Sequence, residues 1–183
     1  MSSAPLNVGT AGRRIFIGKL AGTSVFDPLG EKVGVIHDVV VTFRLHSTAN
    51  VIGFVVEVGP RKRVFLPFTR VTAIEAGSVI TTGLLNIRSF TQRPVETLVI
   101  TELFDREVTM NDGSGTVKIL DVAMQQRRPR DWIISTLHVQ RVRTTTLGFK
   151  RGGTTMTVRI DEVSSLLKTD SNQAATALIQ HTE

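Results

Sequence analysis

The chain has 183 residues, of which 41% are hydrophobic, and it contains no Cys. Its apolar content is too high and its net charge of +6 too small over this length for an intrinsically disordered chain. The absence of Cys excludes a disulfide framework, a thiolate nucleophile and a Cys-ligated zinc site. We therefore expect a packed protein with one domain of ordinary size or two small domains.

The sequence gives no indication of export or of a membrane span. Residues 1–14 lack the apolar core of a secretory signal. Among the longest uncharged stretches is 76–87, which has 12 residues, whereas a membrane-spanning helix needs about 20 apolar residues. We expect a cytoplasmic protein without a transmembrane segment.

Short strands separated by turns are the main pattern of the first half. Segments rich in Val, Ile, Phe and Thr predict strands at 16–20, 33–43, 51–58, 64–68 and 79–82. Asp27, Pro28 and Gly30 occupy positions typical of a tight turn, so we assign them structural roles. Only 69–76 and 161–168 are expected to be helical in the folded part. Such short connections predict antiparallel pairing.

The chain also contains an internal repeat. At an offset of 83 residues, "IHDV" at 36–39 falls on "ILDV" at 119–122, which makes Asp38 equivalent to Asp121. An offset of 81 superposes 51–58 on 132–139, and an offset of 92 superposes 64–74 on 156–166. Changing offsets indicate loops of different length. The order of expected elements is the same in both halves.

The repeat predicts a mainly β fold of two small β-barrels in tandem, with short helices. We expect a disordered N-terminus at 1–12, a first barrel at 13–92 and a second barrel at 97–168. We expect a helical tail at 169–183, because Ala174, Ala177 and Leu178 have helical spacing after Asp170 or Ser171, either of which can cap the helix. This tail could lead to a further domain.

Part of the sequence resembles a known family. The segment 20–41, LAGTSVFDPLGEKVGVIHDVVV, resembles the opening of a PRC-barrel domain, which is also found in the photosynthetic reaction-centre H subunit and in a ribosome-maturation factor. The segments 64–90 and 130–141 are similar to the N-terminal part of actinobacterial proteins related to MgtE-type magnesium transporters. In those proteins two PRC-type barrels precede a helical MgtE N-terminal-like domain and often CBS domains.

This resemblance implies a regulatory or adaptor module that binds other proteins. It supplies no catalytic residues, and it implies only an indirect link to magnesium homeostasis, because the magnesium-sensing residues of the transporter lie in parts that this chain does not contain. We therefore predict a protein that is not an enzyme and has no cofactor.

The excess positive charge lies in the second half. Residues 120–160 contain eight basic and two acidic residues, whereas the rest of the chain contains 14 of each sign. Arg suits bidentate contacts to carboxylates or phosphates. A second basic turn precedes the strand at 64–68. The candidate interaction surface consists of Arg127, Arg128, Arg130, Arg141, Arg143, Lys150, Arg151, Arg61, Lys62 and Arg63.

The sequence contains only weak signals for catalysis or metal binding. Ser114 sits in a Gly-rich turn and not in a nucleophile elbow, and the four His residues lack metal-ligand spacing. Asp27 and Glu31 offer only two carboxylates to a divalent ion. Asp38 and Asp121 are expected at strand ends, where a carboxylate can accept backbone N–H bonds from the next turn, and Trp132 is expected in the core.

We therefore expect the protein to be an adaptor that docks an acidic protein partner on its Arg-rich second barrel. One alternative is a module that binds RNA or the ribosome through the same residues, although no interleaved aromatic platform accompanies the charge. A metal-linked regulator is another. A homodimer formed through an edge strand is also consistent with the sequence.

Overall fold

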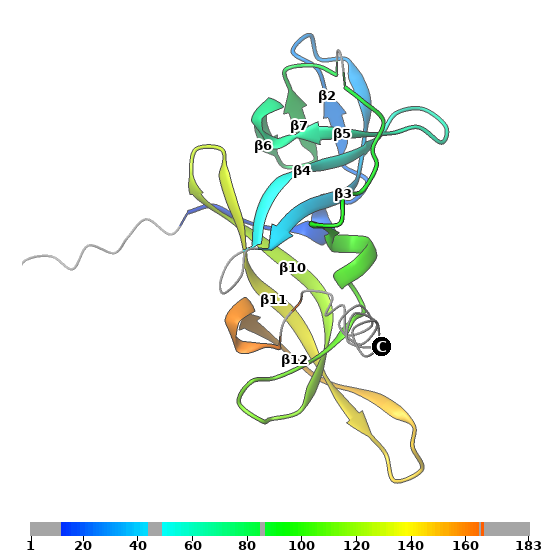
Figure 1. Cartoon of the computed structure of the whole chain (residues 1–183), viewed down its shortest axis with the longest axis vertical. Helices are drawn as coiled ribbons and strands as arrows, with labels where there is room; N and C mark the ends of the chain where they lie inside the picture. Colours follow the sequence, from blue (N-terminus) through cyan, green and yellow to red (C-terminus); the bar gives the residue numbers. More distant parts are fainter. Residues whose placement is uncertain (1–11, 44–48, 85–86, 165, 167–183) are drawn as a thin grey trace, which may run out of the picture.

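A computed structural model of the chain describes residues 12–43, 49–84, 87–164 and 166. They form a mainly β fold, which confirms the expected fold class (Figure 1). The predicted disordered segment lies outside the described residues apart from Gly12, and so do the helical tail, His46 and His181. No helix within the described ranges is long and apolar enough to cross a membrane.

Twelve strands are described, and they fall into two groups of similar order. The first group is β1 (Arg14–Phe16), β2 (Ser24–Phe26), β3 (Lys32–Phe43), β4 (Ala49–Glu57), β5 (Arg63–Pro67), β6 (Val71–Glu75) and β7 (Ser78–Thr81). The second is β8 (Glu96–Leu98), β9 (Glu107–Thr109), β10 (Thr116–Arg128), β11 (Asp131–Thr144) and β12 (Lys150–Arg159). Short helical turns are η1 (Ile17–Lys19), η2 (Phe68–Arg70), η3 (Val99–Leu103) and η4 (Ile160–Glu162).

Most strand predictions are confirmed, but three local assignments are wrong. One is the helix expected at 161–168, where the described residues form only the end of the short turn η4 and then a β-bridge at Val163. The segment 16–20 forms the turn η1 after a short strand. The segment 69–76, expected to be helical, is the end of η2 followed by β6. Its β-branched residues Val71, Thr72 and Ile74 favour a strand, and β6 pairs antiparallel with β7, so tertiary pairing decides the local structure.

The repeat is real, but its register differs from the prediction in one place. Val39 pairs with Phe54 in the first unit, and Val122 pairs with Leu137 in the second, so both strands keep an offset of 83 residues. The predicted offset of 81 for the apolar strand is therefore wrong. The offset of 92 is confirmed, because Leu66 pairs with Phe54 as Val158 pairs with Leu137.

The two units exchange strands. β1 is the first strand of the first unit in sequence but pairs with β10 of the second, while β8 is the first strand of the second unit but pairs with β3 of the first. In addition, β4 and β11 pair directly, with Asn50 opposite Ile133. These two residues are themselves related by the offset of 83. A pseudo-twofold axis therefore passes through this pair, and the two units share one curved sheet (Figure 1).

The carboxylate of Asp38 joins the two units. Asp38 is fully buried in β3, at a bulge, and its Oδ1 accepts the backbone N–H groups of Val39 and Ile100 at 2.7 and 2.8 Å. Its Oδ2 accepts the backbone N–H and the hydroxyl of Thr101 at 2.9 and 2.7 Å. Four donors thus satisfy a charge that would otherwise be costly to bury.

Asp121 makes the equivalent contact from the second unit to the first. Its Oδ1 accepts the backbone N–H groups of Gly18 in η1 and of Val122, at 2.9 and 2.8 Å. A Cβ atom on Gly18 would lie 2.7 Å from Asp121 Oδ2, so glycine permits this close approach. Both Asp residues lie within strands and not at strand ends as expected, and apart from the next residue their partners are 62 to 103 positions away in sequence.

The core is continuous between the units. Phe54 and Phe68 pack with ring centroids 5.6 Å apart, and Phe68 packs against Trp132 of β11 at 6.1 Å. Trp132 is only 5% exposed. The single tryptophan is therefore part of the contact between the two units, and one buried cluster spans both.

Replacing Asp38 by Ala is expected to destabilise the protein by about 3 kcal/mol, because it leaves buried donors on η3 without an acceptor. Asp121→Ala removes two contacts at a half-buried site, so its loss should be smaller, about 1 kcal/mol. Urea unfolding measures both free energies. Equal losses for the two variants would contradict this account of the exchange.

Candidate binding surfaces

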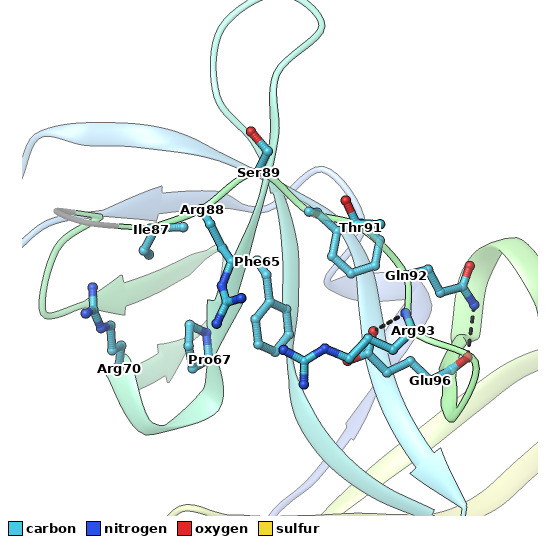
Figure 2. Close-up of a pocket in the computed structure, with 11 residues that line it drawn as sticks. Phe65, Pro67, Arg70, Ile87, Arg88, Ser89, Thr91, Gln92, Arg93 and Glu96 are labelled. Atoms are coloured by element: carbon cyan, nitrogen blue, oxygen red, sulfur yellow. Dashed lines mark hydrogen bonds and ion pairs between the residues drawn. The ribbon is translucent and has the colours of Figure 1, made fainter.

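A groove lies beside β5, where the segment between the two units returns along the first unit. Its volume is about 490 Å³, and it is lined by Phe65, Pro67, Arg70, Ile87, Arg88, Ser89, Phe90, Thr91, Gln92, Arg93 and Glu96. Figure 2 shows the Phe65 ring between the side chains of Arg88 and Arg93. The groove thus combines an aromatic floor with positively charged walls.

The connecting segment is held against β5 by backbone hydrogen bonds. Ser89 forms an antiparallel bridge with Val64, and the N–H of Phe90 donates to the carbonyl of Arg63 at 2.8 Å. Further along, the Gln92 amide donates to the carbonyl of Glu96 at 2.9 Å and to the Glu102 carboxylate at 2.8 Å. The wall of the groove is therefore an ordered part of the fold.

Gly53 allows the floor of the groove to form. A Cβ atom on this residue would lie 2.4 Å from the carbonyl oxygen of Leu66 and 2.6 Å from the Phe65 ring. The ring therefore lies across the bare backbone of β4, where it packs 6.3 Å from the ring of Phe90. The equivalent positions in the second unit, by the offsets of 83 and 92, are Thr136 and Thr157, so the aromatic floor is specific to the first unit.

The groove is positively charged. Three arginines line it against one acidic residue, Glu96. Glu96 is already engaged: its Oε2 accepts the N–H of Arg93 at 3.0 Å, and its Oε1 lies 4.0 Å from Arg93 Nε. Arg88 is exposed and has no ion pair with any described residue. Arg88 and the largely exposed head of Arg93 are thus placed to meet an anionic ligand.

The basic residues predicted in the second unit form two separate groups. Arg127, Arg128 and Arg130 lie at the β10–β11 turn, and Arg127 Nη2 pairs with Asp131 Oδ1 at 3.2 Å. Arg143, Lys150 and Arg151 lie at the other end of the 14-residue strand β11. At about 3.4 Å per residue, the two groups are about 40 Å apart, so they do not form one continuous band.

Of the other predicted basic residues, Arg141 and Arg63 have structural partners. Arg141 donates to the carbonyl of Ser114 at 2.7 Å. In the β4–β5 turn, Arg61 has a left-handed backbone with φ of 66°, Lys62 is exposed, and Arg63 Nε lies 3.8 Å from Glu57 Oε2. This turn projects from the first unit at the right of Figure 1.

The residues considered for catalysis or metal binding have local roles. Ser114 donates its N–H to Asp112 Oδ1 at 2.8 Å within a turn, and hydrogen bonds from Ser114 lower the pKa of Asp112. Asp27 Oδ1 accepts the N–H groups of Leu29 and Glu31 at 2.9 Å in the turn that contains Pro28 and Gly30. Within the described ranges, no three His, Asp or Glu side chains gather as a metal site would require.

Comparison with protein families separates the two units. Residues 13–84 match the PRC-barrel domain, and residues 97–169 match the Actinomycetes SH3 domain. The first unit is similar to a PRC barrel; the second is similar to an SH3 domain. The prediction of two PRC barrels in tandem is therefore wrong for the second unit, and the matches give no link to MgtE-type proteins. No curated protein matches the chain.

The groove was missed in the sequence because its residues come from separate segments. Phe65 and Phe90 are 25 positions apart, and the bridge at Ser89 and the hydrogen bond from Phe90 to Arg63 bring them together. The Phe-rich segment 64–68 and the three arginines at 70, 88 and 93 are visible in the sequence, but nothing local shows that they share one surface.

Replacing Gly53 by Ala is expected to destabilise the protein by about 1 to 3 kcal/mol, because the new methyl group meets the backbone of Leu66 and the Phe65 ring. Thr136→Val, at the equivalent position, serves as the control. It should leave stability unchanged or raise it, since the buried Thr136 hydroxyl has no hydrogen-bond partner among the described residues. Thermal unfolding of both variants tests this, and an unchanged midpoint for Gly53→Ala would contradict it.

Proposed function

We propose that the protein is a non-catalytic binding module whose groove holds an acidic, extended segment of a protein partner. The observation that carries this proposal is the position of the half-buried Phe65 ring between Arg88 and Arg93 (Figure 2). An aromatic floor can contact an apolar side chain, and each guanidinium can donate two parallel hydrogen bonds to a carboxylate.

The geometry favours a peptide with a particular pattern. In an extended chain, side chains alternate between two faces. One apolar residue can then enter the aromatic floor while carboxylates two positions to either side, on the same face, meet Arg88 and Arg93. The match of the second unit to an SH3 domain also suggests a binding module. However, its described aromatics are Phe104, Trp132 and Phe149, of which Trp132 is buried and Phe149 lies at a hairpin tip, so they do not line a groove for proline-rich peptides.

The groove differs from the surface predicted from the sequence, and a matched pair of variants distinguishes them. Arg88→Gln with Arg93→Gln removes one unpaired arginine and one that is paired to a nearby carboxylate. Arg127→Gln with Arg128→Gln removes the same combination at the β10–β11 turn, since Arg127 pairs with Asp131. Both variants lower the net charge equally, so a general electrostatic effect would weaken peptide binding by the same factor in both.

The probe is a fluorescent peptide in which Glu residues lie two positions to either side of a Leu, and its binding is measured by fluorescence anisotropy. We expect Arg88→Gln with Arg93→Gln to weaken binding at least about tenfold, because two charge-assisted hydrogen-bonded pairs are lost, and Arg127→Gln with Arg128→Gln to leave it nearly unchanged. Peptides with Gln for Glu, or Ala for Leu, should also bind more weakly. Equal loss in both variants would contradict the groove assignment, and loss only in the second would favour the β10–β11 turn.

A further inference from the structure

The tip of the β11–β12 hairpin exposes two large apolar side chains. Leu147 is 83% exposed and Phe149 is 69% exposed. Beyond the pair formed by Arg141 and Val117, β11 is paired only with β12 among the described strands. The hairpin therefore extends past the sheet as a two-stranded ribbon, which projects from the body at the lower right of Figure 1.

The tip has an ordered conformation. Thr145 donates its N–H to the carbonyl of Phe149 at 2.8 Å, and Gly148 donates its N–H to the carbonyl of Thr145 at 2.8 Å. Gly148 has a left-handed φ of 82°, which this turn requires and glycine adopts without strain. The hydroxyl of Thr145 also accepts the N–H of Phe149 at 3.2 Å. The turn itself thus presents Leu147 and Phe149 to solvent.

Positive charge lies directly behind the apolar tip. Arg143 and Arg151 are paired across the two strands, an arrangement that is unfavourable unless an anion compensates it. Neither residue has an ion pair with a described acidic residue. Lys150 is the third cation, and both oxygens of Glu107 accept hydrogen bonds from its Nζ at 2.9 Å. Two cations therefore remain available next to the exposed Leu and Phe.

We propose that this tip binds the surface of an anionic lipid membrane, with Leu147 and Phe149 inserted between headgroups and Arg143 and Arg151 on lipid phosphates. A membrane fits better than a protein because the tip is convex and small, whereas a standard protein interface covers about 800 Å² per partner. Apolar side chains next to cations are what interfacial binding to anionic lipids requires. The inference is independent of the groove, which lies on the first unit.

The test uses the full chain and vesicles of phosphatidylglycerol and phosphatidylcholine in equal parts, with pure phosphatidylcholine vesicles for comparison. Sedimentation should show binding to the anionic vesicles only. Leu147→Ser with Phe149→Ser should weaken binding about tenfold or more, because the inserted apolar area is lost. Arg143→Gln with Arg151→Gln should weaken it by about fivefold for each charge.

The control is Leu29→Ser, which removes an equally exposed leucine, 86% exposed, from the β2–β3 turn of the first unit. It should bind as the unchanged protein does. A second readout is Phe149→Trp, whose emission should shift to the blue on anionic vesicles, while the buried Trp132 is little affected. Absence of vesicle binding, equal binding to pure phosphatidylcholine, or retention of binding by Leu147→Ser with Phe149→Ser would overturn the proposal, as would an equal loss in Leu29→Ser.

Discussion

The buried carboxylate of Asp38 is the contact on which the arrangement of the two units depends. It satisfies donors of η3, a turn that belongs by sequence to the second unit, from within a central strand of the first. A charge buried without these donors would be very unfavourable. The carboxylate and the turn therefore require each other, and Asp121 with η1 repeats the arrangement. With β1 and β8 exchanged as well, neither unit completes its sheet from its own consecutive residues.

The two candidate binding surfaces arise where the repeat is broken. Next to β5 of the first unit, the connecting segment lies along the strand and, with Phe65 over Gly53, encloses a charged groove. In the second unit, the positions equivalent to Gly53 and Phe65 are Thr136 and Thr157. Its β11–β12 hairpin is also longer and projects from the sheet. The pseudo-twofold core is thus a rigid support, and the departures from symmetry supply a concave surface on one unit and a convex tip on the other.

The fold could be predicted from the sequence where the signal was local. Runs such as Val39 to Val41 predicted β3, and the "IHDV" and "ILDV" phrases gave the repeat with its main offset. The strand exchange could not be predicted, because it depends on contacts between residues far apart in the sequence. Asp38, for example, accepts hydrogen bonds from Ile100 and Thr101, which are 62 and 63 positions away. The groove could not be predicted for the same reason, because its residues come from segments that are far apart in the sequence.

The central claim is that the strand exchange makes the two units one cooperative structure, and urea unfolding followed residue by residue by NMR tests it most directly. Amides of β7 in the first unit, and of the Lys150 end of β12 in the second, which pairs with Thr144, lie away from the shared axis at Asn50 and Ile133. The account predicts that both sets disappear at the same urea concentration with the same dependence on urea. Loss of one set while the other keeps its native signals would contradict it.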